Sequence, residues 1–186
     1  MRRFTKTLFT VLLLMSGISA SAHDFEVDGI YYNITDNVNN GVEVTFQGEE
    51  WDLYDEYSGQ VVVPETVSHN GVTYTVTGIG AYAFGDCKNL TNVMIPSSVT
   101  IVDKYAFLRC DALQSLNLPS SVTIVKEFAF FGCNGLKNLV LPEGLKVIER
   151  QAFSYSKNLA TLELPASLDS LGLHAFYHVF PCLKSH

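Results

Sequence analysis

The sequence predicts an α/β repeat solenoid, a coil of short strands and short helical or 3₁₀ turns that recur with a 23-residue period. A period in the low twenties is typical of solenoids made of short coils. Three of the four cysteines, Cys87, Cys110 and Cys133, share this spacing. The most regular signal is an Ala-Phe pair that recurs in register as Ala83-Phe84, Ala106-Phe107, Ala129-Phe130, Ala152-Phe153 and Ala175-Phe176.

The first 22 residues have the three parts of a secretory signal peptide. Residues 1–6 are basic, residues 8–15 are apolar but too short to span a bilayer, and Ala20-Ser21-Ala22 offers small residues to a signal peptidase. We therefore expect cleavage between Ala22 and His23. The exported chain is expected to be extracellular, at the cell surface or in the periplasm.

The exported chain is predicted to be acidic. After cleavage, nine Lys and Arg face nineteen Asp and Glu, a net charge of −10. Such a surface disfavours nucleic acid and anionic membranes as partners. No later segment is long and apolar enough for a transmembrane helix, so we expect no membrane insertion after cleavage.

Residues 23–60 do not carry the repeat and are predicted to form a small N-terminal β cap. Asp28-Gly29 is a turn signal between two strand-like runs, and Asn39-Asn40-Gly41 is a second one before an alternating segment. A solenoid must cover the apolar edge of its first coil, so its terminal unit has to differ from the others.

The solenoid is predicted over residues 61–186, with regular coils from residue 79 and a partial last coil at 171–186. A hairpin turn at Asn70-Gly71 interrupts the first half coil. In the regular coils, a Leu-x-Leu-Pro segment predicts a strand with both leucines inward, ended by the proline. The spacing from Ala106 to Leu113 fits one or two helical or 3₁₀ turns.

The cysteine column predicts a packing position and not a disulfide framework. Adjacent coils place these side chains in parallel, so they do not point at one another. We expect Cys87, Cys110 and Cys133 to be buried free thiols that behave as small hydrophobes. Cys182 lies outside the column and is the candidate for an exposed thiol.

The repeated unit I-x-x-x-A-F-x-x-C-x-x-L-x-x-L-x-L-P-x-x-V resembles the BspA-like leucine-rich repeat of bacterial surface proteins. The resemblance covers roughly residues 61–178. It implies a right-handed solenoid, secretion or surface exposure, and in some members adhesion to host matrix proteins or other bacteria. This chain departs from the pattern near its end, where Val179 takes the Cys position and Cys182 takes a Leu position.

The C-terminal end lacks a clear cap in the sequence. Tyr177, Val179, Phe180 and Leu183 are apolar residues that could fold over the last coil. Otherwise, the uncovered edge would favour oligomerisation through this end, because an open strand edge is a template for association.

Two groups of residues are candidates for a binding site. The first is the outward side of the predicted concave strands, the usual binding face in leucine-rich repeats. Its members are Asn92, Met94, Ser115, Asn117, Asn138, Val140, Thr161 and Glu163. The second is the aromatic column Tyr82, Tyr105 and Phe128, whose rings could bind protein or stack on sugars, or simply pack on one another.

The sequence carries no signal for catalysis, a cofactor or a metal centre. No histidine lies in a nucleophile–base motif, and no phosphate-binding loop or zinc motif occurs. His174 and His178 share an i, i+4 spacing but supply only two ligands. The acidic run at residues 49–56 lacks the spacing of a calcium loop and is expected to be solvated.

These observations predict a non-enzymatic, secreted or surface module that recognises a protein or glycan partner outside the cytoplasm, with adhesion as one use. The alternative is a structural or scaffolding module of the cell envelope that has no soluble ligand.

Overall fold

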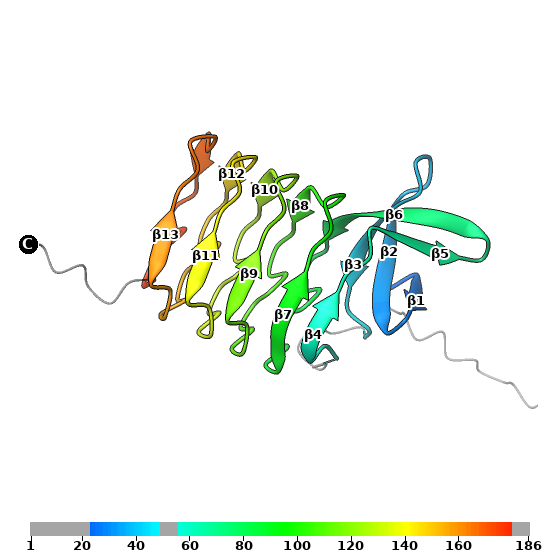
Figure 1. Cartoon of the computed structure of the whole chain (residues 1–186), viewed down its shortest axis with the longest axis horizontal. Coiled ribbons are helices and arrows are strands. Elements are labelled where there is room, and N and C mark those ends of the chain that lie inside the picture. Colours follow the sequence, from blue (N-terminus) through cyan, green and yellow to red (C-terminus); the bar gives the residue numbers. More distant parts are fainter. Residues whose placement is uncertain (1–22, 49–55, 180–186) are drawn as a thin grey trace, which may run out of the picture.

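The computed structural model describes residues 23–48 and 56–179, which form a stack of coils with two sheets running along it (Figure 1). The nine-stranded sheet contains β1 (Phe25–Val27), β2 (Ile30–Asp36), β3 (Gly41–Thr45), β6 (Val72–Ile79), β8 (Ile101–Val102), β10 (Ile124–Val125), β12 (Val147–Ile148) and β14 (Ser170–Leu171), with β5 (Thr66–His69) paired to β6. The five-stranded sheet contains β4 (Gly59–Val62), β7 (Leu90–Met94), β9 (Ser115–Asn117), β11 (Asn138–Val140) and β13 (Thr161–Glu163). The expected signal peptide lies outside the described residues.

Neighbouring strands of the regular coils pair in parallel and in strict register. Ile124 of β10 pairs with Ile101 on one side and Val147 on the other. In the second sheet, Leu139 of β11 pairs with Leu116 and Leu162 in the same way. Each coil therefore lays one short strand in each sheet, and equivalent positions form straight columns across the stack.

The expected helical or 3₁₀ turns are wrong, because the described residues contain strands and turns but no helix. The segment after each of β6, β8, β10, β12 and β14 has a residue with positive φ just before Ala and another three residues after Ala, as at Tyr105 (59°) and Arg109 (52°) in one coil. A left-handed residue every four positions cannot continue a right-handed helix. The amide of Ala106 instead donates to Asp103, closing a tight turn.

These turn segments are also bonded from coil to coil. The amide of Phe84 donates to the carbonyl of Ala106 at 2.8 Å, and Phe107 repeats this bond to Ala129 at 2.7 Å. In a helix, these amides would instead donate to carbonyls of the same helix. The chain therefore gives up helical bonding in the turns and gains bonds between coils.

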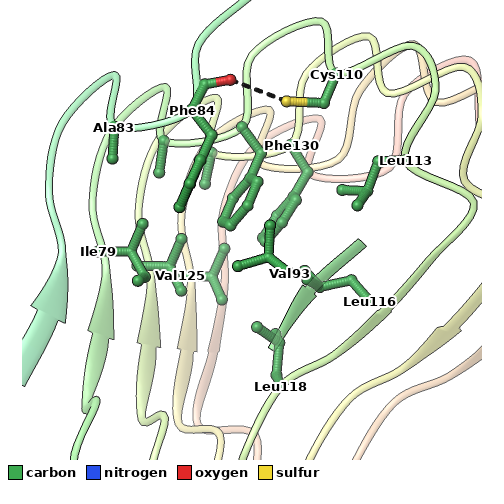
Figure 2. Packing of buried hydrophobic residues seen from close by; sticks show 14 of the residues in the cluster. Ile79, Ala83, Phe84, Val93, Cys110, Leu113, Leu116, Leu118, Val125 and Phe130 are labelled. Carbon is green, nitrogen blue, oxygen red and sulfur yellow. Dashed lines mark hydrogen bonds between the residues drawn. The ribbon is translucent and has the colours of Figure 1, made fainter. Parts of the chain in front are cut away.

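A stack of phenylalanine rings runs through the centre of the solenoid. Phe84, Phe107, Phe130 and Phe153 are fully buried, and successive ring centroids lie 4.9–5.0 Å apart with interplanar angles of 19° or less. Tyr57 extends the stack toward the N-terminal strands, with its ring centroid 4.9 Å from that of Phe84. Leucine and valine side chains from both sheets surround these rings (Figure 2).

The prediction of buried free thiols is confirmed for Cys87, Cys110 and Cys133. The Cys110 thiol donates to the carbonyl of Phe84 at 3.0 Å (Figure 2), and Cys133 repeats the contact to Phe107. In the next coil, Ser156 occupies the same position and its hydroxyl donates to Phe130 at 2.9 Å. From Cys110 to Ser156, this position of the coil therefore carries a small side chain that donates a hydrogen bond to the neighbouring coil. The candidate for an exposed thiol, Cys182, lies outside the described residues.

The N-terminal strands prolong only one of the two sheets. β1, β2 and β3 are antiparallel, and β3 then pairs in parallel with β6. Asp28-Gly29 joins β1 to β2, and Asn70-Gly71 joins β5 to β6, each with two positive φ values that suit a tight hairpin turn. The Tyr57 hydroxyl donates to Thr45 and accepts from the amide of Tyr31, which fixes the start of the stack.

Within the described parts of the chain, no helix is long and apolar enough to cross a membrane.

Candidate binding surface

The outer face of the five-stranded sheet presents the predicted binding residues in two columns. Side chains alternate along each strand, so Leu116 is buried while Ser115 and Asn117 on either side are exposed. Asn92 is half-buried, and Thr161 lies in β13, where its backbone pairs with Asn138. The remaining predicted members are exposed on this face: Met94, Asn138, Val140 and Glu163.

Two members of this face were missed by sequence analysis. Gln60 and Val62 of β4 pair with Asn92 and Met94, so they begin the same two columns. The side-chain amide of Gln60, through Nε2, also donates to the Met94 sulfur at 3.3 Å. The signal was a strand-like run at residues 59–62, but a hairpin inserted after it breaks the 23-residue spacing.

One of the two columns is apolar at most of its positions. The exposed fraction is 56% for Val62, 52% for Met94 and 67% for Val140. Asn117 lies between them, and Glu163 ends the column. Exposed apolar side chains aligned on a rigid sheet are a feature of protein contact surfaces.

A groove of about 510 Å³ lies at the C-terminal end of this face. Val140 and Glu163 line it, together with Leu164 and two prolines, Pro142 and Pro165. Leu164 is half-exposed, whereas the equivalent Leu141 is buried. The groove therefore combines apolar walls with two carboxylates, those of Glu143 and Glu163.

The aromatic column is a close stack of parallel rings. The centroid of Tyr105 lies 4.7 Å from that of Tyr82 and 5.0 Å from that of Phe128, with interplanar angles of 6° and 5°. The Arg150 guanidinium lies 5.1 Å from the Phe128 centroid, over the ring. The faces of Tyr105 and Phe128 are thus occupied, and a sugar could reach only ring edges.

A second aromatic group follows the column toward the C-terminal end. Phe131 contacts Phe128 and Tyr155, with centroids 5.7 and 5.1 Å apart, and these rings are tilted. Tyr155 in turn contacts Tyr177 and His178. His178 therefore packs against aromatic rings.

Charged side chains border the aromatic column. Glu127 lies between Lys104 and Arg150, at 3.6 Å from each. Lys126 donates to Asp103 at 2.7 Å. Glu43 lies on β3. Burial raises the pKa of its carboxyl group, and Asp103 raises this pKa to a smaller extent, while Lys126 opposes the shift.

Among residues 23–48 and 56–179, no three His, Cys, Asp or Glu side chains gather as a metal site would require. The acidic run considered for calcium lies outside the described residues, except for Glu56. Burial raises the pKa of Cys133 to about 12 and also raises that of Cys110, so these thiols are protonated at neutral pH and are poor nucleophiles.

Comparison with known proteins identifies the repeat. The model of the BspA type Leucine rich repeat region matches residues 67–182 in 6 copies. The chain is similar in structure to a leucine-rich repeat protein from Bacteroides ovatus ATCC 8483, with a TM-score of 0.72 and 32% identity over 83% of this chain and 38% of that chain. No curated protein matches the chain.

A second similar structure is the leucine-rich repeat protein of T. pallidum, with a TM-score of 0.71 and 28% identity over 83% of this chain and 67% of that chain. The pneumococcal vaccine antigen PcpA shares the fold, with a TM-score of 0.59 and 21% identity over 86% of this chain and 48% of that chain. The chain spans little more than a third of the Bacteroides ovatus protein. Since the family match covers more than half of the sequence, the chain belongs to the BspA-type leucine-rich repeat proteins.

Proposed function

We propose that this protein is an exported, non-enzymatic module that binds a protein, or a glycan, through the outer face of its five-stranded sheet, and that such binding serves adhesion to host or bacterial surfaces. The observation that carries the proposal is the exposed apolar column Val62, Met94 and Val140 on that face. Asn117 within the column, and Ser115 and Asn138 beside it, supply hydrogen-bonding groups.

The rigidity of the face supports this proposal. The three inner strands, β7, β9 and β11, are held in register by the strands on both sides, and the Phe stack lies beneath. A surface that is ordered before binding loses little conformational entropy when a partner docks. Repeats of the BspA type are also typical of protein-binding surface modules and not of enzymes.

The basic and apolar leader at residues 1–22 supports export, with cleavage between Ala22 and His23. Export would bring the outer face into contact with partners at the cell surface, in the medium or in the periplasm. N-terminal sequencing of the protein recovered from its producing bacterium tests this part, with His23 as the expected first residue.

A structural role in the envelope is favoured by a different observation. The last described coil exposes four apolar residues near the C-terminal end of the stack, Leu164, Leu171, Leu173 and Tyr177. Such an end would support oligomerisation through the C-terminal end of the chain. Analytical ultracentrifugation separates the two roles, because a scaffold would self-associate without any partner.

The test of recognition uses an array of glycans and a panel of purified matrix proteins. We expect Met94→Glu with Val140→Glu to abolish capture of the partner that the unmodified protein retains, because both substitutions place charge in the apolar column. Val38→Glu is the matched control, since Val38 is 88% exposed in the turn between β2 and β3, away from this face. Equal capture by the double variant and the unmodified protein would contradict the proposal.

A further inference from the structure

Charge is distributed very unevenly along the chain. Residues 23–87 contain twelve Asp and Glu and no Lys or Arg, whereas residues 88–186 contain seven Asp and Glu and nine Lys and Arg. The cap and the first coil are therefore strongly acidic, while the rest of the solenoid is close to neutral. The electrostatic potential around the N-terminal end is therefore negative and favours cationic partners.

The five-stranded sheet ends at this acidic end, because the strands that precede β4 in the chain prolong the other sheet. β4 pairs with β7 on one side only (Figure 1). The amides of Gly59 and Val63 donate toward β7, to Asn89 at 2.8 Å and to Met94 at 3.0 Å.

Backbone groups alternate in direction along a strand, so those of Gln60 and Val62 point away from β7. No described strand pairs with this side of β4. Among the described residues, this edge therefore leaves the backbone donors and acceptors of Gln60 and Val62 without a strand partner.

A groove follows this open edge between β4 and the β1–β2 hairpin. It consists of two adjoining hollows of about 280 and 270 Å³, which share Asp28, Ile30 and Val62 as lining residues. Tyr32 and Tyr57 contribute to the lining and are buried, so part of the groove is apolar.

Two carboxylates border the groove without a basic neighbour from the cap. Asp28 is exposed at the hairpin turn, and Glu56 lines the second hollow. One oxygen of Glu56 accepts from the amide of Gln47 at 2.8 Å, which holds the side chain in place. Lys or Arg side chains on an incoming strand would complement both charges.

We propose that the free edge of β4 binds an extended, cationic polypeptide segment, which adds to the five-stranded sheet as a further strand. Main-chain hydrogen bonds from Gln60 and Val62 hold the segment, alternate side chains enter the apolar groove, and basic side chains meet Asp28 and Glu56. The side chains of Gln60 and Val62 belong to the outer face, but strand addition uses their backbone groups at the edge, so the inference does not rest on the function proposed for that face.

The test uses a blocked six-residue peptide of alternating arginine and valine, which favours an extended conformation. Hydrogen exchange resolved by NMR should show the amides of Gln60 and Val62 slowed by about tenfold when the peptide saturates the protein. The same peptide with glutamate in place of arginine should not bind. Absence of binding by the arginine peptide, or binding without protection of these two amides, would overturn the proposal.

Variants separate the backbone contribution from the charge contribution. Val62→Pro removes the outward amide at an edge that tolerates proline and should weaken peptide binding about tenfold, whereas Val62→Thr keeps the amide and should bind normally. Asp28→Asn with Glu56→Gln should weaken binding about threefold to tenfold and flatten its salt dependence, with Glu143→Gln as the distant control. Normal binding by both Val62→Pro and the charge variant would refute strand addition.

Two further outcomes are decisive. Met94→Glu with Val140→Glu should leave peptide binding intact, so failure of the outer face as a binding site would not be mistaken for failure of the edge. Protection of Gln60 and Val62 that appears without peptide and grows with protein concentration would show that a second copy covers the edge, which contradicts the proposal.

Discussion

At the scale of single residues, the coils are joined by a small side-chain donor that satisfies a buried carbonyl of the neighbouring coil. Cys110 and Cys133 reach Phe84 and Phe107, and Ser156 reaches Phe130 with the same geometry. The carbonyls of Phe84 and Phe107 also accept a backbone amide within their own turns, from Cys87 and Cys110. A carbonyl oxygen has two lone pairs, so each thiol uses the remaining one on Phe84 and Phe107.

The first prediction concerns these thiols. In the native protein, iodoacetamide at pH 8 should leave Cys87, Cys110 and Cys133 unmodified for hours, because burial excludes the reagent and the raised pKa of Cys110 and Cys133 removes the thiolate. Mass spectrometry after tryptic digestion measures this directly. The same reaction in urea is the control and should modify all of them. Rapid native labelling of the column would show that the coils open readily.

A second residue-scale prediction concerns Glu43. Its folded pKa is raised above the usual 4.5, mainly by burial, so the folded state holds its proton more tightly than the unfolded state does. Stability from this group is therefore present at low pH and is lost as pH rises through the folded pKa. Glu43→Gln should be more stable than the unmodified protein at pH 7, and the difference should vanish near pH 4. Urea titrations at both pH values test this; a less stable variant at pH 7 would mean that the attraction of Lys126 dominates.

At the scale of elements, the turn segments set the spacing of the stack as much as the strands do. Tyr82, Tyr105 and Phe128 all have positive φ, and their rings stack at the rim while the following Ala-Phe pairs enter the core. A left-handed backbone at an aromatic residue costs about 1–2 kcal/mol. The bonds between neighbouring turns and the stacked rings offset this cost.

The third prediction compares the two ring stacks. Phe107→Ala leaves a cavity between coils and should lower the free energy of unfolding by about 3–5 kcal/mol. Tyr105→Ala should cost clearly less, because its ring is half-exposed at the rim. Urea denaturation followed by circular dichroism gives both values. Equal losses of free energy would show that the aromatic column belongs to the core and is not a candidate binding site.

The fourth prediction tests the left-handed turns. At Tyr105, where φ is 59°, glycine should be more stable than alanine by about 1 kcal/mol, since glycine adopts this conformation without strain. At Tyr74 in β6, where φ is not positive, the order should be reversed. Four single variants compared by thermal unfolding settle the point; alanine ahead of glycine at both positions would contradict the turn geometry.

The strands and the core were predictable from the sequence because period-two Leu-x-Leu segments and the Ala-Phe register have direct physical meanings. Leu116 and Leu118 are buried as expected, and the hairpin at Asn70-Gly71 forms as its residues indicate. The left-handed turns were not predictable, because aromatic residues have no local preference for positive φ and only the bonds between coils impose it.

The outer face was predicted only in part for a related reason. Val62 pairs with Met94, 32 residues further along the chain, because the β5–β6 hairpin lies between them. A search by period alone therefore misses β4, although its strand-like run is visible. The position of the open edge beside the β1–β2 hairpin depends on tertiary contacts that no sequence pattern encodes.

At the scale of the whole molecule, charge and stability are distributed along a single axis. The acidic residues from 23 to 87 have no Lys or Arg among them, whereas later coils pair their charges, as Lys126 does with Asp103. In a stack where each coil contacts only its neighbours, unpaired charge changes the stability of the coils that carry it and of the adjacent coils. The N-terminal end therefore carries most of the molecule's self-repulsion.

The fifth prediction follows from this distribution. Raising the salt concentration from about 0.01 M to about 0.5 M shortens the distance over which charges repel from ~30 Å to a few ångströms. Hydrogen exchange in β2 and β3 should slow markedly, while exchange in β10 and β12 should change little. Sodium chloride against an equal osmolarity of sucrose separates screening from general stabilisation. A uniform change along the stack would contradict a repulsive N-terminal end.

The same contacts join successive coils, and this repetition has a consequence for how the gene can gain or lose repeats. A Phe ring on a Phe ring, a parallel strand pair and a donor to a carbonyl recur at successive junctions. Duplicating or deleting one such unit in the gene, for example residues 102–124, creates only joints of a kind already present and leaves both ends unchanged. Unequal recombination can therefore alter the reach of the molecule in steps of about 4.8 Å without inventing a new contact.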